Sequence, residues 1–202
     1  MKLLPSFTLE WNAVLALEDE EYRIGKDAIK RLISLHGNKI DLGIVTTAAS
    51  ENNRDREFSP TAHDFQSRLD GVGLGSVTKV KTAIIVGLTY VGYGFYPEKD
   101  FEEIVGAIWD IVRPEGIPRR HSDFAVEKGI EENTSLHSPN YFKWRNKWCD
   151  VHSLYAHLVS KRDVFVTGDV KNFSGDRKTR LGQLGISNIL SYDDALELAL
   201  SI

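Results

Sequence analysis

The sequence is poor in cysteine. Only Cys149 occurs among its 202 residues, so no disulfide can form within the chain. The six histidines are scattered and are not spaced with other thiols as in a zinc finger, so we expect no structural zinc site. No apolar run approaches the length of a membrane-spanning helix, and Pro5 breaks the apolar segment at the start. These absences predict a cytoplasmic protein with no part in a membrane.

The sequence also has no excess of basic over acidic residues. The formal net charge of -4 argues against a uniformly basic surface for nucleic acid, although it leaves a local basic groove open. The chain contains no internal repeat and no low-complexity linker that would divide it. Its hydrophobic residues, 42% of the total, are enough to build a real core. We therefore expect a single domain over residues 1–202.

Patterns typical of strands and of helices alternate along the chain. Strand patterns occur at residues 6–10, within 39–50, at 163–167 and at 187–191. Helical patterns occur at residues 12–21, where Asn12 is the expected N-cap, and at 25–36, 100–112, 146–162, 177–185 and 193–200. Because such alternation favours a parallel sheet, we predict an α/β fold. Residues 118–138 are polar and aperiodic, which predicts a long loop or an irregular insertion.

Acidic residues follow several of these predicted strands. Glu10 ends the first strand, Glu51 follows the second at the start of a helix, and Asp169 follows the strand at 163–167. Asp150 lies in the first turn of the predicted helix at 146–162. Because ligands of parallel sheets bind beyond the carboxyl ends of the strands, we expect these four carboxylates to converge.

Four carboxylates in one place favour a metal site. Like charges raise one another's pKa, so the acids stay ionised only with cations between them, and hard oxygen ligands favour Mg2+ or Mn2+. The natural partner of such a site is a phosphate. Taken singly, each acid is more often a helix cap, an Asx-turn residue or a first-turn charge. Their combined order along the chain reverses that preference.

Several motifs resemble, in chain order, those of the PIN-domain nucleases. They are "LEWNAVLAL", the Glu51 that closes "VTTAASEN", "CDVHSLYAHL", and "DVFVTGDVKNF" followed by "LGQLGISNILSYDDALEL". The resemblance covers roughly the first sixty and the last sixty residues. Residues at about 59–146 would then form an insertion longer than is usual for the family.

The resemblance implies a fold, an activity and a set of site residues. The fold would be a PIN-like three-layer α/β/α sandwich with a central parallel sheet. The activity would be that of a hydrolase, a Mg2+- or Mn2+-dependent endoribonuclease that cleaves single-stranded RNA, with DNA the less common substrate. It implies that Glu10, Glu51, Asp150 and Asp169 are the catalytic, metal-binding acids, flanked by the polar Asn12 and Thr167. The family includes toxins neutralised by an antitoxin, RNA-processing enzymes, subunits that bind partner proteins, and homodimers.

One position departs from the family pattern. The first acid of the family is usually aspartate, and the glutamate at position 10 is one methylene longer. A displacement of about 1 Å can cost on the order of 100-fold in rate. The alternative function is therefore a catalytically weak PIN-like module that binds RNA or a protein. A phosphatase or receiver-like protein is a weaker rival, because "VTGDVKN" lacks an Asp-x-Asp pair.

Basic and aromatic residues suggest where nucleic acid could bind. The stretch "NYFKWRNKW" mixes aromatic residues with Lys143, Arg145 and Lys147, which suits base stacking and phosphate contacts. An equally good interpretation is that Trp144 and Trp148, four residues apart, belong to the core side of a helix. Arg177 and Lys178, close to Asp169, are further candidates for phosphate contacts.

Overall fold

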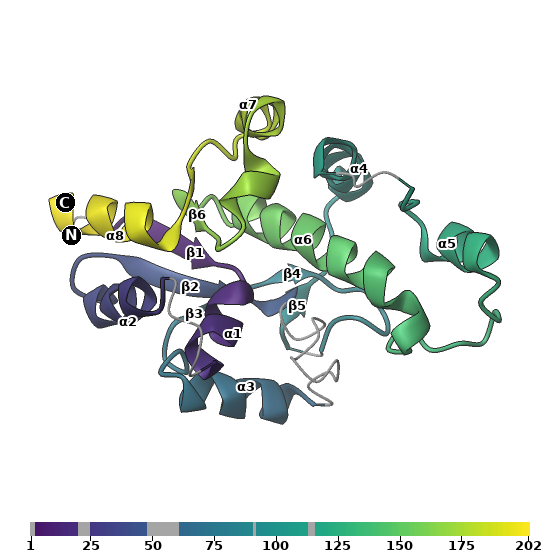
Figure 1. The fold of residues 1–202 in the computed structure, drawn as a ribbon, viewed down its shortest axis with the longest axis horizontal. Coiled ribbons are helices and arrows are strands. Elements are labelled where there is room, and N and C mark those ends of the chain that lie inside the picture. Colours follow the sequence, from purple (N-terminus) through teal and green to yellow (C-terminus); the bar gives the residue numbers. More distant parts are fainter. Residues whose placement is uncertain (1–2, 20–24, 48–60, 91, 113–115) are drawn as a thin grey trace.

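A parallel sheet of five strands lies at the centre of the protein (Figure 1). The computed structural model describes residues 3–19, 25–47, 61–90, 92–112 and 116–202. The order of the strands is β3-β2-β1-β6-β7. Their bounds are Ser6–Leu9 for β1, Asp41–Val45 for β2, Thr78–Val80 for β3, Val164–Val166 for β6 and Ile189–Leu190 for β7. All four pairings within this sheet are parallel, as predicted.

Helices cover both faces of the sheet. One core forms against α1 (Asn12–Glu18), α2 (Lys26–Leu35), α3 (Ala62–Gly71) and α8 (Tyr192–Ser201). The second core forms against α4 (Phe101–Val112), α6 (Phe142–Val159) and α7 (Asp176–Gln183). Figure 1 shows the two groups of helices on either side of the strands. The predicted three-layer α/β/α sandwich is confirmed.

The alternation of side chains along the strands explains why two cores form. Phe7 and Leu9 of β1 enter the first core, while Thr8 between them faces α6 and lies 2.9 Å from His157 Nδ1 through its hydroxyl. In β6 the pattern is the same: Val164 and Val166 enter the first core and Phe165 the second. A parallel strand buried on both faces has this composition.

Three local expectations are wrong. Asn12 is the first residue of α1 rather than its N-cap, which is Trp11. Helix α6 begins at Phe142, so Asp150 lies in its middle and not in its first turn. Residues 118–138 contain a helix, α5 (His121–Lys128), followed by a 3-10 turn, η2 (Pro139–Tyr141). The remaining predicted elements that fall within the described residues are present.

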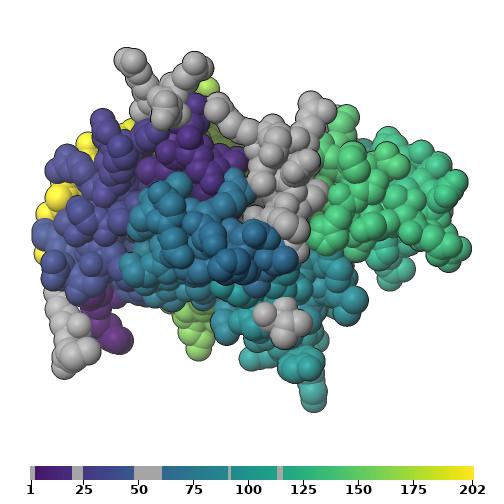
Figure 2. All heavy atoms as spheres, turned by 90° about the horizontal axis from the view of Figure 1, so that it is seen from below, coloured from purple at the N-terminus to yellow at the C-terminus, as the bar shows by residue number. Residues whose placement is uncertain are grey.

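The segment at 82–141 builds outward from the sheet. A small parallel pair, β4 (Thr82–Ala83) and β5 (Gly94–Phe95), leads to α4, α5 and the start of α6. Helix α5 and the first turns of α6 extend to one side of the molecule, where they form the green lobe of Figure 2. None of the helices in the described part of the chain is long and apolar enough to cross a membrane.

Candidate metal centre

Two neighbouring strands bring the first polar groups of the site together. In the pairing of β1 with β6, Leu9 lies opposite Val166, and the backbone N–H of Glu10 donates to the carbonyl of Val166 at 3.1 Å. The next residues, Glu10 and Thr167, therefore leave the sheet side by side. Both are buried, with Glu10 3% exposed. Parallel pairing alone explains why residues 157 positions apart meet at this edge.

Thr167 and Asn12 hold the Glu10 carboxylate in place. The Thr167 hydroxyl donates to Glu10 Oε2 and accepts from the backbone N–H of Asp169 at 3.0 Å. Asn12 Nδ2 donates to the same Glu10 oxygen at 3.2 Å. This second bond explains why Asn12 does not cap α1, since its side chain turns back toward the sheet edge. The two polar residues predicted to flank the acids thus lie beside Glu10.

Asp150 and Asp169 reach the same region from α6 and from the segment after β6. Asp150 Oδ2 accepts from the ammonium of Lys147 at 2.5 Å, one turn earlier on α6. Asp169 Oδ2 accepts from Asn172 Nδ2, in the short 3-10 turn η3 (Val170–Phe173). Asp169 is exposed to solvent, whereas the side chain of Asp150 is only 29% exposed.

The three acids share one pattern of hydrogen bonding. Glu10 Oε2, Asp150 Oδ2 and Asp169 Oδ2 are each held by donors. The other carboxylate oxygen of each residue makes no hydrogen bond to the described part of the chain. The neutral donors Thr167, Asn12 and Asn172 can stay in place when the other oxygen binds a metal, because outer hydrogen bonds orient the ligand. The Lys147 ammonium carries a positive charge and would instead compete with the metal for Asp150.

Electrostatic coupling between the acids is visible in their pKa values. Burial, together with the negative charges of Asp150 and Asp169, raises the pKa of Glu10 to about 8, against the lowering effect of its two hydrogen bonds. Burial also raises the pKa of Asp150, and Asp169 adds to this, while the Lys147 ammonium opposes both. Glu10 and Asp150 thus carry a cost of ionisation that a cation would offset.

The donor set suits a hard divalent cation. Three carboxylates, a hydroxyl and an amide offer oxygen atoms alone as ligands, which is the chemistry of Mg2+ and Mn2+ sites. Within the described residues, however, no three acidic, histidine or cysteine side chains are arranged closely enough to hold one ion. The carboxylates would therefore have to draw together around a cation, which requires Asp150 to exchange the Lys147 ammonium for it.

The remaining predicted site residues have different outcomes. Glu51, the second acid, lies outside the described residues. Trp144 and Arg145 are buried, and Trp144 packs with Trp148 in the second core, as in the alternative interpretation of this stretch. Lys143 is exposed but Lys147 is engaged with Asp150. Lys178 is exposed on α7, and the neighbouring Arg177 donates to the backbone oxygen of Asn172 at 3.2 Å.

Two contacts of the site were not foreseen from the sequence. Asn172 lies three residues after Asp169, a spacing that suits a turn and could have indicated the contact. Lys147 lies three residues before Asp150, a spacing at which helical side chains meet, yet it was interpreted as a nucleic-acid contact. Both residues neutralise or orient an acid of the site.

No model of a protein family matches the chain, and a search of curated proteins found no significant match.

Proposed function

We propose that the protein is a PIN-like, Mg2+- or Mn2+-dependent nuclease that cleaves single-stranded RNA in the cytoplasm. The observation that carries the proposal is the electrostatic interaction of Glu10 with Asp150 and Asp169 beside the carboxyl ends of β1 and β6, with one oxygen of each acid not hydrogen-bonded to any described residue. The order of these acids along the chain supports it further, because it follows the PIN motifs. Parallel sheets place ligands at this edge.

The roles of the residues follow from their positions. Glu10, Asp150 and Asp169 would hold the cation, together with Glu51 if the resemblance extends to it. A bound divalent cation lowers the pKa of a coordinated water and stabilises charge on a phosphodiester. Thr167 and Asn12 fix the orientation of the Glu10 carboxylate. Arg177, close to Asp169 through Asn172, is placed to contact a phosphate of the strand.

Cleavage of RNA tests the proposal directly. The purified chain with Mn2+ and a single-stranded RNA should give products with a 5′-phosphate and a 3′-hydroxyl, and EDTA should abolish the reaction. Asp169→Asn should slow cleavage by at least about 100-fold, a loss typical of removing one group that stabilises the transition state. Asp176→Asn is the matched control, because Asp176 is an exposed acid on α7 outside the site. Equal cleavage by the chain and both variants would show a contaminant and reject the proposal.

A PIN-like module that binds RNA or a partner protein without cleaving it is the second candidate. It is favoured by the ion pair between Lys147 and Asp150, which already neutralises one acid, and by the longer side chain of Glu10. Titration with Mn2+ in a calorimeter separates the two functions. Absence of Mn2+ binding with RNA binding retained would support the module, whereas Mn2+ binding that Asp169→Asn weakens would support the nuclease.

A further inference from the structure

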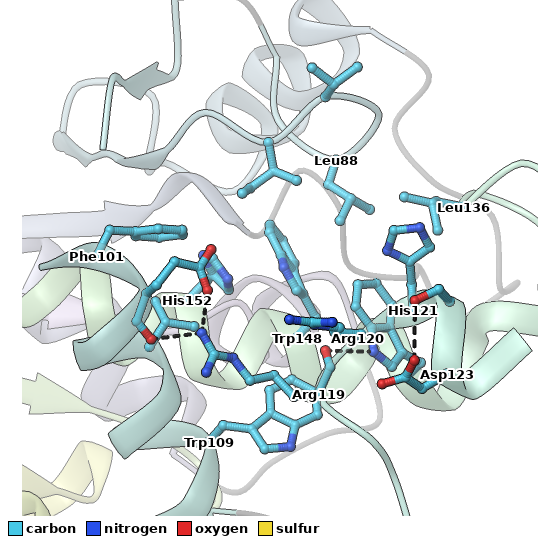
Figure 3. Close-up of a pocket in the computed structure, with 16 residues that line it drawn as sticks. Leu88, Phe101, Trp109, Arg119, Arg120, His121, Asp123, Leu136, Trp148 and His152 are labelled. Carbon is cyan, nitrogen blue, oxygen red and sulfur yellow. Dashed lines mark hydrogen bonds and ion pairs between the residues drawn. The ribbon is translucent and has the colours of Figure 1, made fainter. Parts of the chain in front are cut away.

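A cavity of about 730 Å³ lies between α4, α5 and α6, away from the acidic site. Its walls are mostly apolar and aromatic and include Phe101, Trp109, Trp144, Trp148 and Leu136. Figure 3 shows Phe101 and His152 at one end of the cavity, and His121 and Asp123 at the other. Cavities of this size and apolar character are typical of sites for small organic ligands.

The cavity and the acids lie on different sides of α6. Trp148 and His152 face the cavity, and they are four residues apart on one side of the helix. Asp150 lies between them in sequence, about 160° around the helix axis from each at 3.6 residues per turn. The ring of Trp148 stacks on that of His152, with centroids 4.0 Å apart. The cavity is therefore a separate site, and an inference from it does not rest on the proposed nuclease.

Two arginines lie at the mouth of the cavity, together with the acids Glu102 and Asp123. Arg119 and Arg120 both line it and are both exposed. Arg119 is fixed by Glu102, whose backbone oxygen accepts from Nη2 at 2.7 Å and whose carboxylate forms an ion pair with it. The Arg120 guanidinium forms no ion pair with any described residue. It is therefore available to an anion, and arginine suits phosphate because its planar group donates two parallel hydrogen bonds.

Backbone N–H groups at the start of α5 also favour an anion at the mouth of the cavity. Helix α5 begins at the same mouth, with His121, Ser122 and Asp123 as its first turn, and no side chain caps it. The first N–H groups of a helix lack partners within the helix and carry partial positive charge, which favours an anion. Asp123 opposes an anion here, while the charge of Glu102 is already paired with Arg119.

The charge of Arg119 also affects a buried histidine inside the cavity. His152 is 2% exposed, and its Nδ1 lies 3.4 Å from the Thr82 hydroxyl. Burial lowers the pKa of His152 to about 3, and the positive charge of Arg119 contributes to the decrease. A neutral, apolar interior beneath a mouth where Arg120 has no ion pair to a described residue suits a ligand with an anionic group at one end and an uncharged ring system at the other.

We propose that this cavity binds a phosphate monoester that carries an aromatic group. The phosphate would lie at the mouth against Arg120, Arg119 and the start of α5, and the ring system would lie along the aromatic walls. Two sources share this chemistry: a free nucleoside monophosphate, and the 5′-phosphorylated end of an RNA strand.

Binding experiments with the full chain in EDTA test the proposal without involving the metal centre. In a calorimeter, adenosine 5′-monophosphate should bind at least 10-fold more tightly than adenosine. It should also change tryptophan fluorescence, because three of the four tryptophans line the cavity. Equal binding of the two compounds, or no binding of adenosine 5′-monophosphate up to about 10 mM, would overturn the proposal. Inorganic phosphate binding as tightly as adenosine 5′-monophosphate would overturn the role of the aromatic walls.

Two variants test the mouth of the cavity. Arg120→Ala removes an exposed side chain and should weaken adenosine 5′-monophosphate at least 10-fold, whereas Lys128→Ala, which removes a charge from the other end of α5, should not. Gly106→Ala is a second probe, because a Cβ at this position in α4 would lie 2.5 Å from Arg119 Nη1 and displace it. Alanine also favours a helix over glycine, so this variant should fold and bind several-fold more weakly. Unchanged affinity in both Arg120→Ala and Gly106→Ala would reject the site.

RNA oligonucleotides identify the source of the phosphate. A tetranucleotide with a 5′-phosphate that binds more tightly than adenosine 5′-monophosphate, and loses this advantage in Arg120→Ala, would assign the strand end. Tighter binding of the free nucleotide would assign a small-molecule ligand. Equal binding of 5′-phosphorylated and 5′-hydroxyl tetranucleotides, unaffected by Arg120→Ala, would count against the strand end.

Discussion

Helix α6 separates two regions that carry different charged groups. On one side, Asp150 faces Glu10 and Asp169, and on the other, Trp148 and His152 face a cavity with arginines at its mouth. Each region buries one ionisable group. Burial and neighbouring negative charge raise the pKa of Glu10 to about 8, and burial and neighbouring positive charge lower that of His152 to about 3. Both groups are therefore neutral at pH 7.

The comparison separates two ways of making a binding site. The acidic region arises from strand ends, so its groups are fixed by the register of the sheet. The cavity arises from helices and loops of the segment at 82–152, and its charge comes from residues at a helix start. In each region a buried group, Glu10 or His152, is disfavoured in its charged form because neighbouring residues carry charge of the same sign. The acids would therefore bind a cation, and the arginines would bind an anion. The following changes test this difference, from the largest expected effect to the smallest.

Glu10→Gln should change the dependence of stability on pH. The folded chain retains the proton of Glu10 up to about pH 8, whereas the unfolded chain loses it near pH 4.5. The folded state thus binds more protons between these values, so the free energy of unfolding falls as pH rises from 4.5 to 8. In EDTA, the free energy of unfolding of Glu10→Gln should not fall in this way. At pH 9 the variant should be more stable than the original chain by roughly 3–5 kcal/mol. Urea unfolding at pH 5, 7 and 9 measures the free energy of unfolding of both proteins. The same dependence on pH in the two proteins would contradict the raised pKa of Glu10.

Trp148→Ala and Asp150→Asn should separate structure from function on α6. Trp148 is 5% exposed and packs in the second core, so truncation should lower the free energy of unfolding by about 3 kcal/mol. Asp150 is partly exposed, and the negative charge of Asp169 repels its carboxylate. Replacement by asparagine should therefore change the free energy of unfolding by less than about 1 kcal/mol. Urea unfolding at pH 7 in EDTA measures both. An equal loss in the two variants would mean that Asp150 is primarily structural.

The sheet and most of its edge could be predicted from the sequence because they depend on local patterns. Apolar strands such as Val164–Val166 and the amphipathic helix Lys26–Leu35 carry their own periodicity. An acid directly after a strand, such as Glu10, can be placed once the strands are known to be parallel. Thr167 was predicted to flank Asp169, and its hydroxyl also donates to Glu10, because the two strands end side by side.

What the sequence could not predict depends on contacts between distant segments. Arg145 carries a charge and is nevertheless fully buried, with Nη1 donating to the backbone oxygen of Leu136, so polarity alone wrongly suggested a surface residue. Helix α5 has a weakly amphipathic sequence and forms against Tyr141 and Trp144, to which His121 and Phe124 pack. The cavity depends on all of these packings, which no local pattern records.

Thr167→Val should weaken the proposed metal centre while keeping the shape of the side chain. It removes the hydroxyl that donates to Glu10 and accepts from the backbone of Asp169. Loss of such an orienting group commonly costs 10- to 100-fold in metal affinity, so Mn2+ binding measured by calorimetry should weaken by about that factor. Thr179→Val on α7 is the matched control, because the Thr179 hydroxyl is exposed and donates to the backbone oxygen of the nearby Gly175. Equal affinities in the two variants would remove Thr167 from the site.

Lys147→Met should have the smallest effect and the opposite sign. The Lys147 ammonium lies 2.5 Å from Asp150 Oδ2, where it competes with any other cation for that carboxylate. Two positive charges a few ångströms apart near a protein surface repel by about 1–4 kcal/mol, so removing one should tighten Mn2+ binding by about 10-fold. Lys143→Met, one turn earlier on the same helix and exposed, should leave the affinity unchanged. Weaker Mn2+ binding in Lys147→Met would show that the lysine orients Asp150 for the cation, and the proposed exchange at this carboxylate would be wrong.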